Sequence, residues 1–481
     1  MTVGYGQGLA ALEREIDLDA LPVTGDFPAW LDGTLVRNGP ARFELGRQTL
    51  RHWFDGLAML HRFSFHAGTV SYANRYLRSP DYTYATEHGK LGYSQFATDP
   101  CRSLFKRVTS MFSPQFGHNA SVNVSMIADR FVAWTETPLP VEFDPRTLRT
   151  LGVFDFDDDW DALTTTPHPH TDPANGDALN NTVKFGPTSA YKVYRIPAGA
   201  RRRVPIAALP VKEPAYMHSF SQTARYVVLA EYPFVVNPLD LVFNGVVKGM
   251  SFAENLRWKP EQPTTFIVID KGDGAVVGRY PCDPFFSFHH VNAFERDDEL
   301  VLDLLAFQDA SVVQKLYLDV LRHPEGGHCP APPTELRRYR LPLRGERTAR
   351  ASYEVVSREN MELPRINDAR CNAAEYRYMY ASGTREGQPY AFQNQLVKVD
   401  TMCGDACIWY AGDCYPGEPV FVPAPDARAE DDGVVLSVVL DAPKGTSFLL
   451  VLDAHTFAEI ARAEVPHHIP FGFHGQYFPG L

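Results

Sequence analysis

The chain has 481 residues, about three times the length of a typical domain, so its length alone leaves the number of domains open. Its 46 basic and 58 acidic side chains give a net charge of −12 without a block of like charges, which argues against a nucleic-acid partner. Hydrophobic residues make up 44% and charged residues 22% of the chain, a composition that excludes intrinsic disorder.

The N-terminal residues carry neither a secretory signal nor a nucleotide-binding loop. The first 21 residues lack a basic region followed by an apolar one, so we expect a cytoplasmic protein. Gly4, Gly6 and Gly8 follow no strand, which a dinucleotide-binding loop requires, and they predict a flexible terminus. A short helix is predicted over 8–15.

Most of the remaining chain has the pattern of an all-β protein. Pro and Gly are spread evenly and separate short runs of Val, Ile, Phe, Tyr and Thr. In chain order, strands are predicted over 70–77, 130–136, 226–232, 265–269, 300–307, 377–382, 396–400, 433–440 and 447–453. Hairpins are predicted over 266–280 and 446–465. Repeated hairpins in a long chain favour a β-propeller or a large barrel, because both limit exposed strand edges.

One segment, 99–112, has the pattern of a basic amphipathic helix. Its apolar and basic side chains fall on opposite sides at helical spacing: Leu104, Phe105, Val108, Met111 and Phe112 against Arg102, Lys106 and Arg107. Two interpretations stay open, an ordinary helix packed on the protein body and a peripheral membrane contact at the rim of an apolar entrance. No apolar run approaches the roughly 20 residues that cross a bilayer.

The cysteines do not predict a metal site. All seven are scattered along the chain, which is typical of reduced thiols rather than of a disulfide framework. Cys403, Cys407 and Cys414 lie close in sequence, but no second pair completes a zinc motif.

Four histidines carry the strongest chemical signal. The chain contains no nucleophile elbow, no zinc-protease helix motif and no phosphate-binding loop. His168, His218, His289 and His474 each lie among aromatic, Pro or Gly residues, separated by 50, 71 and 185 residues. A single buried His is usually a hydrogen-bonded core residue, but four in such settings indicate ligands that different parts of the fold bring to one metal.

At these residues the chain resembles the carotenoid cleavage oxygenases, which include carotenoid and apocarotenoid cleavage dioxygenases, stilbene dioxygenases and a retinoid isomerase. The similarity runs nearly from end to end. Besides the four histidine segments, its landmarks are Arg37-Asn-Gly-Pro40, 54–61, 72–76, Thr135-Glu136 before 144–148, 362–367, 417–422 and 430–437.

The resemblance implies one domain over 1–481, a seven-bladed β-propeller with loops and short helices capping an axial iron site. It implies one Fe2+ per chain, held by four histidines that match the family's segments, namely His168 rather than His170, His218, His289 rather than His290, and His474. Glu136, Glu362 and Glu418 match the family's glutamates that accept the other ring N–H of three of these histidines.

The implied reaction is the addition of O2 across one C=C bond of an apolar polyene, which gives two carbonyl products. An apolar tunnel must then bring the chosen bond to the iron. Phe54, Thr135, Phe288 and Phe473 are the candidate wall residues of this tunnel, and core packing is the alternative for the three phenylalanines.

Two features favour a carotenoid or apocarotenoid substrate within the family. Stilbene-cleaving relatives tend to carry a Lys at the position of Thr135, which contacts the phenol of the substrate. The segment that begins Asp99-Pro-Cys-Arg looks like the membrane-facing segment of the animal enzymes. The alternatives are a stilbene dioxygenase, a retinoid isomerase and a non-enzymatic carrier of apolar ligands on the same propeller.

Overall fold

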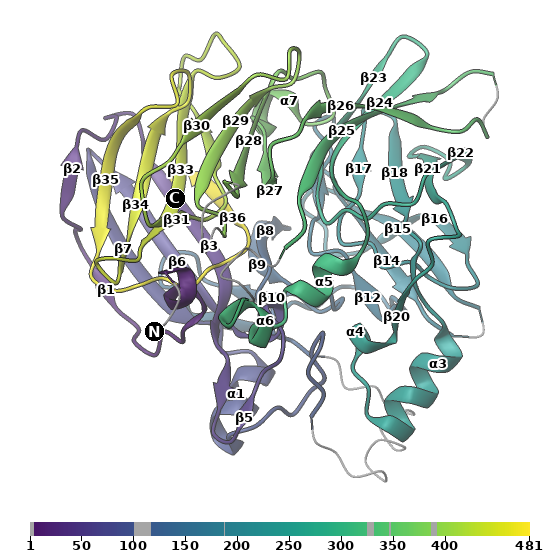
Figure 1. Ribbon diagram of the computed structural model, residues 1–481, viewed down its shortest axis with the longest axis horizontal. Helices are drawn as coiled ribbons and strands as arrows, with labels where there is room; N and C mark the ends of the chain where they lie inside the picture. Colours follow the sequence, from purple (N-terminus) through teal and green to yellow (C-terminus); the bar gives the residue numbers. More distant parts are fainter. Residues whose placement is uncertain (1–3, 101–116, 187, 325–330, 346–347, 386–391) are drawn as a thin grey trace.

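The computed structural model describes residues 4–100, 117–186, 188–324, 331–345, 348–385 and 392–481. Its sheets form the seven blades of a β-propeller, as predicted, arranged around a central axis (Figure 1). Each blade is an antiparallel sheet of at least four strands. In chain order they are called the first to the seventh blade, the first being the one that contains both β3 and the last strand of the chain.

The strands of the first three blades come from the N-terminal part of the chain and from its end. The first blade contains β1 (Asp17–Leu18), β7 (Thr69–Tyr76), β6 (Leu57–His66), β3 (Gly33–Arg42) and β36 (Gly475–Pro479). The second contains β11 (Thr150–Val153), β10 (Val141–Phe143), β9 (Arg130–Trp134) and β8 (Asn123–Ile127). The third contains β12 (Thr164–Thr165), β14 (Ala178–Lys184), β15 (Ala190–Ile196) and β16 (Val204–Pro210), with β13 (His170–Thr171) also paired to β14.

The other four blades follow in sequence. The fourth contains β17 (Ser221–Gln222), β18 (Tyr226–Glu231), β21 (Thr264–Asp270) and β22 (Val276–Cys282). The fifth contains β23 (His290–Arg296), β24 (Glu299–Phe307), β25 (Thr334–Pro342) and β26 (Ser352–Ser357). The sixth contains β27 (Met361–Arg365), β28 (Tyr378–Gly383), β29 (Gln395–Asp400) and β30 (Ala406–Trp409). The seventh contains β2 (Val23–Gly25), β35 (Glu459–Val465), β34 (Thr446–Asp453), β33 (Gly433–Asp441), β31 (Cys414–Pro416) and β32 (Val420–Pro423).

Strands from both ends of the chain close the ring. In the first blade β36 pairs with β3, and in the seventh blade the early strand β2 pairs with β35. Closure pairs strands that would otherwise be exposed edges. A propeller or a barrel was expected from the sequence because both folds limit such edges. Both predicted hairpins are confirmed, as β21 with β22 and β34 with β35. Each of the nine predicted strands overlaps an observed one, with ends that differ by a residue or two.

Short helices and two small sheets lie outside the blades. The small sheets pair β4 (Glu44–Leu45) with β5 (Gln48–Thr49) and β19 (Phe234–Val236) with β20 (Leu256–Trp258). The helices are η1 (Gly4–Leu9), η2 (Trp53–Asp55), α1 (Pro80–His88), α3 (Pro238–Phe243), η3 (Asn244–Lys248), α4 (Phe252–Asn255), α5 (Ser311–Lys315), α6 (Leu318–Arg322) and α7 (Asp368–Cys371). Figure 1 shows α1, α3, α4, α5 and α6 along the lower side of the propeller. Among the described residues no helix is long and apolar enough to span a membrane.

Two expectations for the N-terminus were wrong. Residues 4–8 are not a flexible terminus, because they form η1, in which Tyr5 is fully buried and donates a hydrogen bond to the Leu321 carbonyl at 2.8 Å. The helix predicted over 8–15 is absent, since η1 ends at Leu9 and the Leu12 N–H bonds to the Ala41 carbonyl instead. Gly8 lies so close to the ring of Phe471 that a Cβ there would collide with it. Tertiary packing therefore decides the structure of this segment.

The amphipathic helix predicted over 99–112 lies outside the described residues from Cys101 onward.

Candidate metal centre

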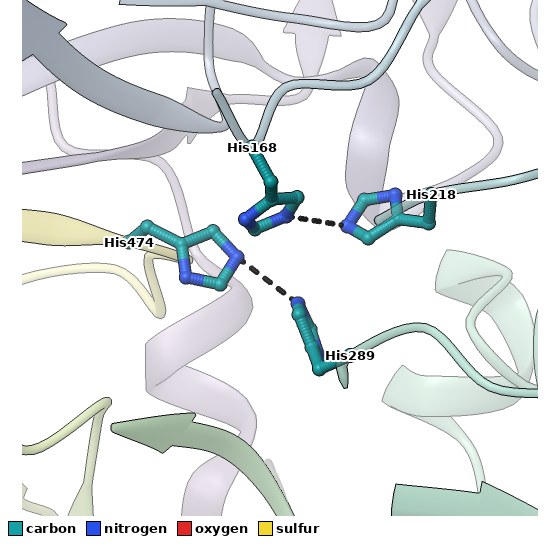
Figure 2. Close-up of side chains that lie close together, drawn as sticks. All are labelled: His168, His218, His289 and His474. Carbon is teal, nitrogen blue, oxygen red and sulfur yellow. Dashed lines mark hydrogen bonds between the residues drawn. The ribbon is translucent and has the colours of Figure 1, made fainter. Parts of the chain in front are cut away.

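Four imidazoles meet near the axis of the propeller. One nitrogen from each of His168, His218, His289 and His474 lies within 4.8 Å of the others (Figure 2). The Nε2 atoms of His168 and His218 are 3.1 Å apart, and those of His289 and His474 are 3.2 Å apart. The structure thus brings together the four histidines chosen as metal ligands from the sequence.

Each of these histidines lies one to three residues before a strand at the inner edge of its blade. His168 precedes β13, His218 precedes β17, and His289 and His474 directly precede β23 and β36. Four different blades therefore supply the cluster, which explains the long separations in sequence. The neighbouring His170 and His290 face other partners, because His170 Nε2 bonds to the Phe220 carbonyl and His290 bonds to Ser221 and Tyr232.

Hydrogen bonds between neighbouring loops hold the histidines in place. The Ser219 hydroxyl donates to the Phe288 carbonyl at 2.6 Å and accepts from the His290 N–H at 3.0 Å, so it joins the loops that carry His218 and His289. The His474 N–H donates to the Val122 carbonyl at 3.1 Å. The amide of Asn123 donates to the Pro167 carbonyl at 3.0 Å, beside His168.

Three of the four rings bind a glutamate through Nδ1. His218 Nδ1 lies 2.7 Å from Glu136 Oε1, and His474 Nδ1 lies 2.8 Å from Glu418 Oε1. His289 Nδ1 bonds to Glu362 Oε2. Within the described part of the chain, no carboxylate pairs with His168 in this way. A carboxylate on Nδ1 fixes the tautomer that leaves the Nε2 lone pair free, which is the form that binds a metal.

The three glutamates differ in their other contacts. Glu418 is buried between two guanidinium groups, since it pairs with Arg37 and lies 3.5 Å from Arg365. Burial would raise the pKa of Glu418, but Arg365, His474 and Arg37 outweigh it and lower the pKa to about 2. Glu136 accepts a hydrogen bond from the Tyr216 hydroxyl. These arginines and Tyr216 were not predicted as site residues, although they lie in or next to the sequence segments that carry the resemblance.

Burial lowers the pKa of three of the four imidazoles, those of His168, His218 and His474, which keeps these three neutral at physiological pH. It lowers the pKa of His474 to about 3, although Glu418 acts in the opposite direction. Burial also lowers the pKa of His168 and of His218 below the ordinary value of 6.5. Neutral rings with inward-facing Nε2 lone pairs repel one another unless a cation lies between them, so the donor set fits a divalent metal ion.

A cavity of about 460 Å³ borders this cluster at His218, His289 and His474. Its wall contains all four predicted tunnel residues, which are Phe54, Thr135, Phe288 and Phe473. The ring of Phe54 contacts that of Phe473 at a centroid distance of 5.3 Å and that of Phe288 at 5.9 Å. The cavity wall is mainly apolar and can hold a hydrophobic molecule beside the histidines.

Parts of the wall were not predicted from the sequence. They are Leu241, Val242 and Gly245 around α3 and η3, Met250 and Phe252 beside α4, Leu363, Phe392 and Gln393. Apart from Leu363, which lies in the landmark 362–367, none of them belongs to a recognised motif, so only the fold reveals their place. The three cysteines that resembled part of a zinc motif lie elsewhere, and Cys403 and Cys407 are exposed.

Comparison with known proteins identifies close relatives over the whole chain. A family model described as retinal pigment epithelial membrane protein matches residues 9–479. The chain is 35% identical to beta,beta-carotene 15,15'-dioxygenase of Mus musculus, across 100% of this chain and 92% of that protein. It is 34% identical to the mitochondrial carotenoid-cleaving dioxygenase of Mustela putorius furo, across 98% of this chain and 95% of that protein. A cobalt-substituted apocarotenoid oxygenase of Synechocystis has a similar structure, with a TM-score of 0.85, 25% identity and coverage of 99% and 98%.

Proposed function

The chain belongs to the carotenoid oxygenase family and is an oxygenase, and we propose that it uses Fe2+ and O2 to cleave one C=C bond of a carotenoid or apocarotenoid into two carbonyl products. The observation that carries the proposal is the cluster of four imidazoles beside an apolar cavity. Imidazole suits Fe, Zn, Cu and Ni, and Zn2+ has no redox chemistry. Iron fits an oxygenase because, when bound, it supplies the activation of O2.

The chain's own residues would hold the metal and orient the rings that bind it. His168, His218, His289 and His474 would bind the metal, and their glutamate partners would keep three of the rings in the metal-binding tautomer. The donor set is neutral, so the metal keeps its positive charge.

The cavity would position the substrate. A polyene has no charged group, so its binding depends on apolar contact with side chains such as Phe54, Phe288 and Phe473. The same aromatic wall excludes water from the reacting bond. The cleavage needs no general acid or base, and the three glutamates beside the cluster are already bonded to histidines.

A stilbene substrate is less well supported. Thr135 lies on the cavity wall where stilbene-cleaving relatives tend to carry a Lys, and no Lys or Arg belongs to the wall in the described part of the chain. Among the described wall residues, a phenolic substrate would therefore find no cationic side chain to pair with.

We also propose a peripheral membrane contact beside the cavity. On α3, Leu239 is 79% exposed and Phe243 is 57% exposed, while the neighbouring Leu241 and Val242 line the cavity. Figure 1 shows α3 projecting at the lower right edge of the molecule. Exposed apolar side chains next to the cavity suit a substrate that arrives from lipid. The segment 99–112 remains a candidate for the same contact.

Product analysis tests the proposed reaction. The Fe2+-loaded protein is incubated in air with β-carotene, an apocarotenal and a hydroxystilbene, and products are identified by liquid chromatography with mass detection. Aldehydes from a polyene support the proposal, and their masses locate the cleaved bond. Cleavage of the stilbene alone, or of nothing although iron is bound, would contradict it.

A further inference from the structure

Glu418 is the glutamate of the metal centre whose partners carry positive charge. Arg37 Nη1 donates to Glu418 Oε2 at 2.5 Å, and Arg365 Nη1 lies 3.5 Å from Glu418 Oε1. The side chains of Glu418 and Arg37 are 1% and 6% exposed, so water and salt screen this pair weakly. Arg365 also lies 3.5 Å from Asp368, whose half-exposed carboxylate is in contact with water. Two guanidinium groups therefore face one buried carboxylate.

The other two glutamates of the metal centre lack such compensation among the described residues. Glu136 accepts a hydrogen bond from the Tyr216 hydroxyl, which is a neutral donor. Besides the His289 ring, Glu362 accepts from the backbone N–H of Leu363 at 3.0 Å, which is neutral as well. Within the described chain, neither carboxylate forms an ion pair with a Lys or Arg. The buried positive charge is therefore confined to one side of the centre.

The same two arginines reach the peptide groups on both sides of His474. Arg37 Nη2 donates to the carbonyl of Phe473 at 3.1 Å, and Arg365 Nη1 donates to that of Gly475 at 3.1 Å. Their shared carboxylate partner lies 2.8 Å from the Nδ1 atom of the His474 ring. Each guanidinium is thus one carboxylate and one imidazole away from the position where a metal would bind. The two charges act on that position through protein rather than through water.

Negative charge near an iron ion favours Fe3+ over Fe2+, because the ion of higher charge gains more from it. A carboxylate on the outer nitrogen of a ligand histidine brings such charge and makes the ring a stronger donor. A cation that is paired with this carboxylate opposes both effects. Hydrogen bonds and charges around the ligands are among the means by which proteins set the potential of an iron centre.

We propose that Arg37 and Arg365 compensate the charge of Glu418 and so raise the Fe3+/Fe2+ potential of the metal centre. They are positioning residues, because they act on the iron through Glu418 and His474. This inference rests on the proposed use of Fe2+. A higher potential disfavours the transfer of one electron from Fe2+ to O2, which would leave Fe3+ and superoxide before a polyene is bound. The arginines therefore keep the centre in the ferrous form.

Three substitutions separate the charge from the geometry. Arg365→Gln removes the charge but keeps an amide that can donate to the Gly475 carbonyl, whereas Arg365→Lys keeps the charge and loses the planar fork. Arg203→Gln is the matched control, since Arg203 is 6% exposed and pairs with Asp158, outside the metal centre. The midpoint potential of each iron-loaded full-length protein is measured without substrate by mediated titration, with the ferric EPR signal as readout. The thermal midpoint of each protein checks its fold.

We expect Arg365→Gln to increase the ratio of Fe3+ to Fe2+ at a given potential about 10-fold, which equals a fall of the midpoint potential by about 59 mV. Arg365→Lys and Arg203→Gln should stay within about twofold of the wild type. Adding Glu418→Gln to Arg365→Gln should return the ratio toward the wild-type value, because one negative charge is removed together with one positive charge. Equal potentials of all variants, or an equal shift in the two variants of Arg365, would overturn the inference.

A further variant keeps the test decisive. If Arg365→Gln does not fold, Glu418→Gln tests the proposal with the opposite sign, because it leaves both arginines without their counter-charge and should lower the ratio of Fe3+ to Fe2+ about 10-fold. An unchanged ratio in that variant would overturn the inference. If the wild type binds no iron, the proposed function itself fails. If the wild type binds iron and its potential equals that of the folded variants, only the role of the arginines fails.

Discussion

The Nε2 atoms of His289 and His474 lie 3.2 Å apart, although each ring bonds through Nδ1 to its own glutamate, Glu362 and Glu418. If both rings donate Nδ1–H to these carboxylates, neither neutral ring has a proton left on Nε2, so the two lone pairs face each other. Such a contact is unfavourable alone and becomes favourable around a shared cation. This relationship is the physical basis for assigning the cluster to a metal.

Replacing a ligand should remove the metal, whereas replacing its neighbour should not. His289→Ala is expected to abolish Fe2+ binding and polyene cleavage, because one of four donors is lost. His290→Ala is the matched control, since His290 bonds to Ser221 and Tyr232 and faces away from the cluster. Metal content per chain, measured by elemental analysis, distinguishes the two. Equal loss of iron in both variants would show that the ligand is assigned to the wrong histidine.

Removing the charge of a glutamate should weaken metal binding without unfolding the protein. Glu362→Gln is expected to lower Fe2+ affinity roughly 10–100-fold, because the amide is a weaker acceptor for the His289 ring. The thermal midpoint of the metal-free protein should change little, since Glu362 has no salt bridge to Lys or Arg among the described residues. Anaerobic titration measures the affinity. An unchanged affinity would show that Glu362 does not contribute to metal binding.

The metal-free protein should lose stability as the pH falls below about 6.5. Burial lowers the pKa of His52 to about 3, of His290 to about 3 and of His170 to about 4. From pH 6.5 down to those values, the unfolded chain binds protons that the folded chain does not, which costs up to about 1.4 kcal/mol per pH unit for each histidine.

Asp55 acts with the opposite sign. Burial raises its pKa to about 6, so between its ordinary value and pH 6 the folded state holds a proton that the unfolded chain has released. This gain in the free energy of unfolding offsets about as much as one of the three histidines costs. The free energy of unfolding of the metal-free protein, measured with urea, should therefore fall as the pH is lowered from 8 to 5. A constant or rising value would contradict the prediction that the histidines outweigh Asp55.

Charges on α3 should weaken attachment to lipid. The double variant Leu239→Glu with Phe243→Glu is expected to reduce co-flotation with phosphatidylcholine vesicles several-fold, because it places two carboxylates in an apolar exposed surface. The matched control is Met402→Glu with Ile408→Glu, on exposed positions of the sixth blade. Equal flotation of both variants and the wild type would show that α3 is an ordinary surface helix.

The sequence predicted the blades better than their assembly. Strands such as 433–440 and 447–453 are continuous apolar runs between turns, and local pattern identifies them. Composition could not show that His168 and His474, from the third and first blades, meet at one point, because their encounter depends on closure of the ring. The resemblance to a known family supplied that step.

The parts that the sequence did not predict depend on tertiary packing. Tyr5 lies in a glycine-rich segment that looks flexible, yet the surrounding rings of Phe392 and Tyr415 bury it. Leucine at position 363 gives no sign of a left-handed backbone, because leucine disfavours that conformation in isolation. In both places the surrounding structure overrides local preference.

The origin of the product oxygens tests the central claim most directly. The Fe2+-loaded protein is given the polyene that it cleaves under ¹⁸O2 in ordinary water, and the aldehydes are reduced at once so that they cannot exchange with solvent. One ¹⁸O atom is expected in each of the two fragments, because O2 adds across the bond that breaks. A fragment whose oxygen comes from water, or the absence of cleavage products with iron bound, would contradict it.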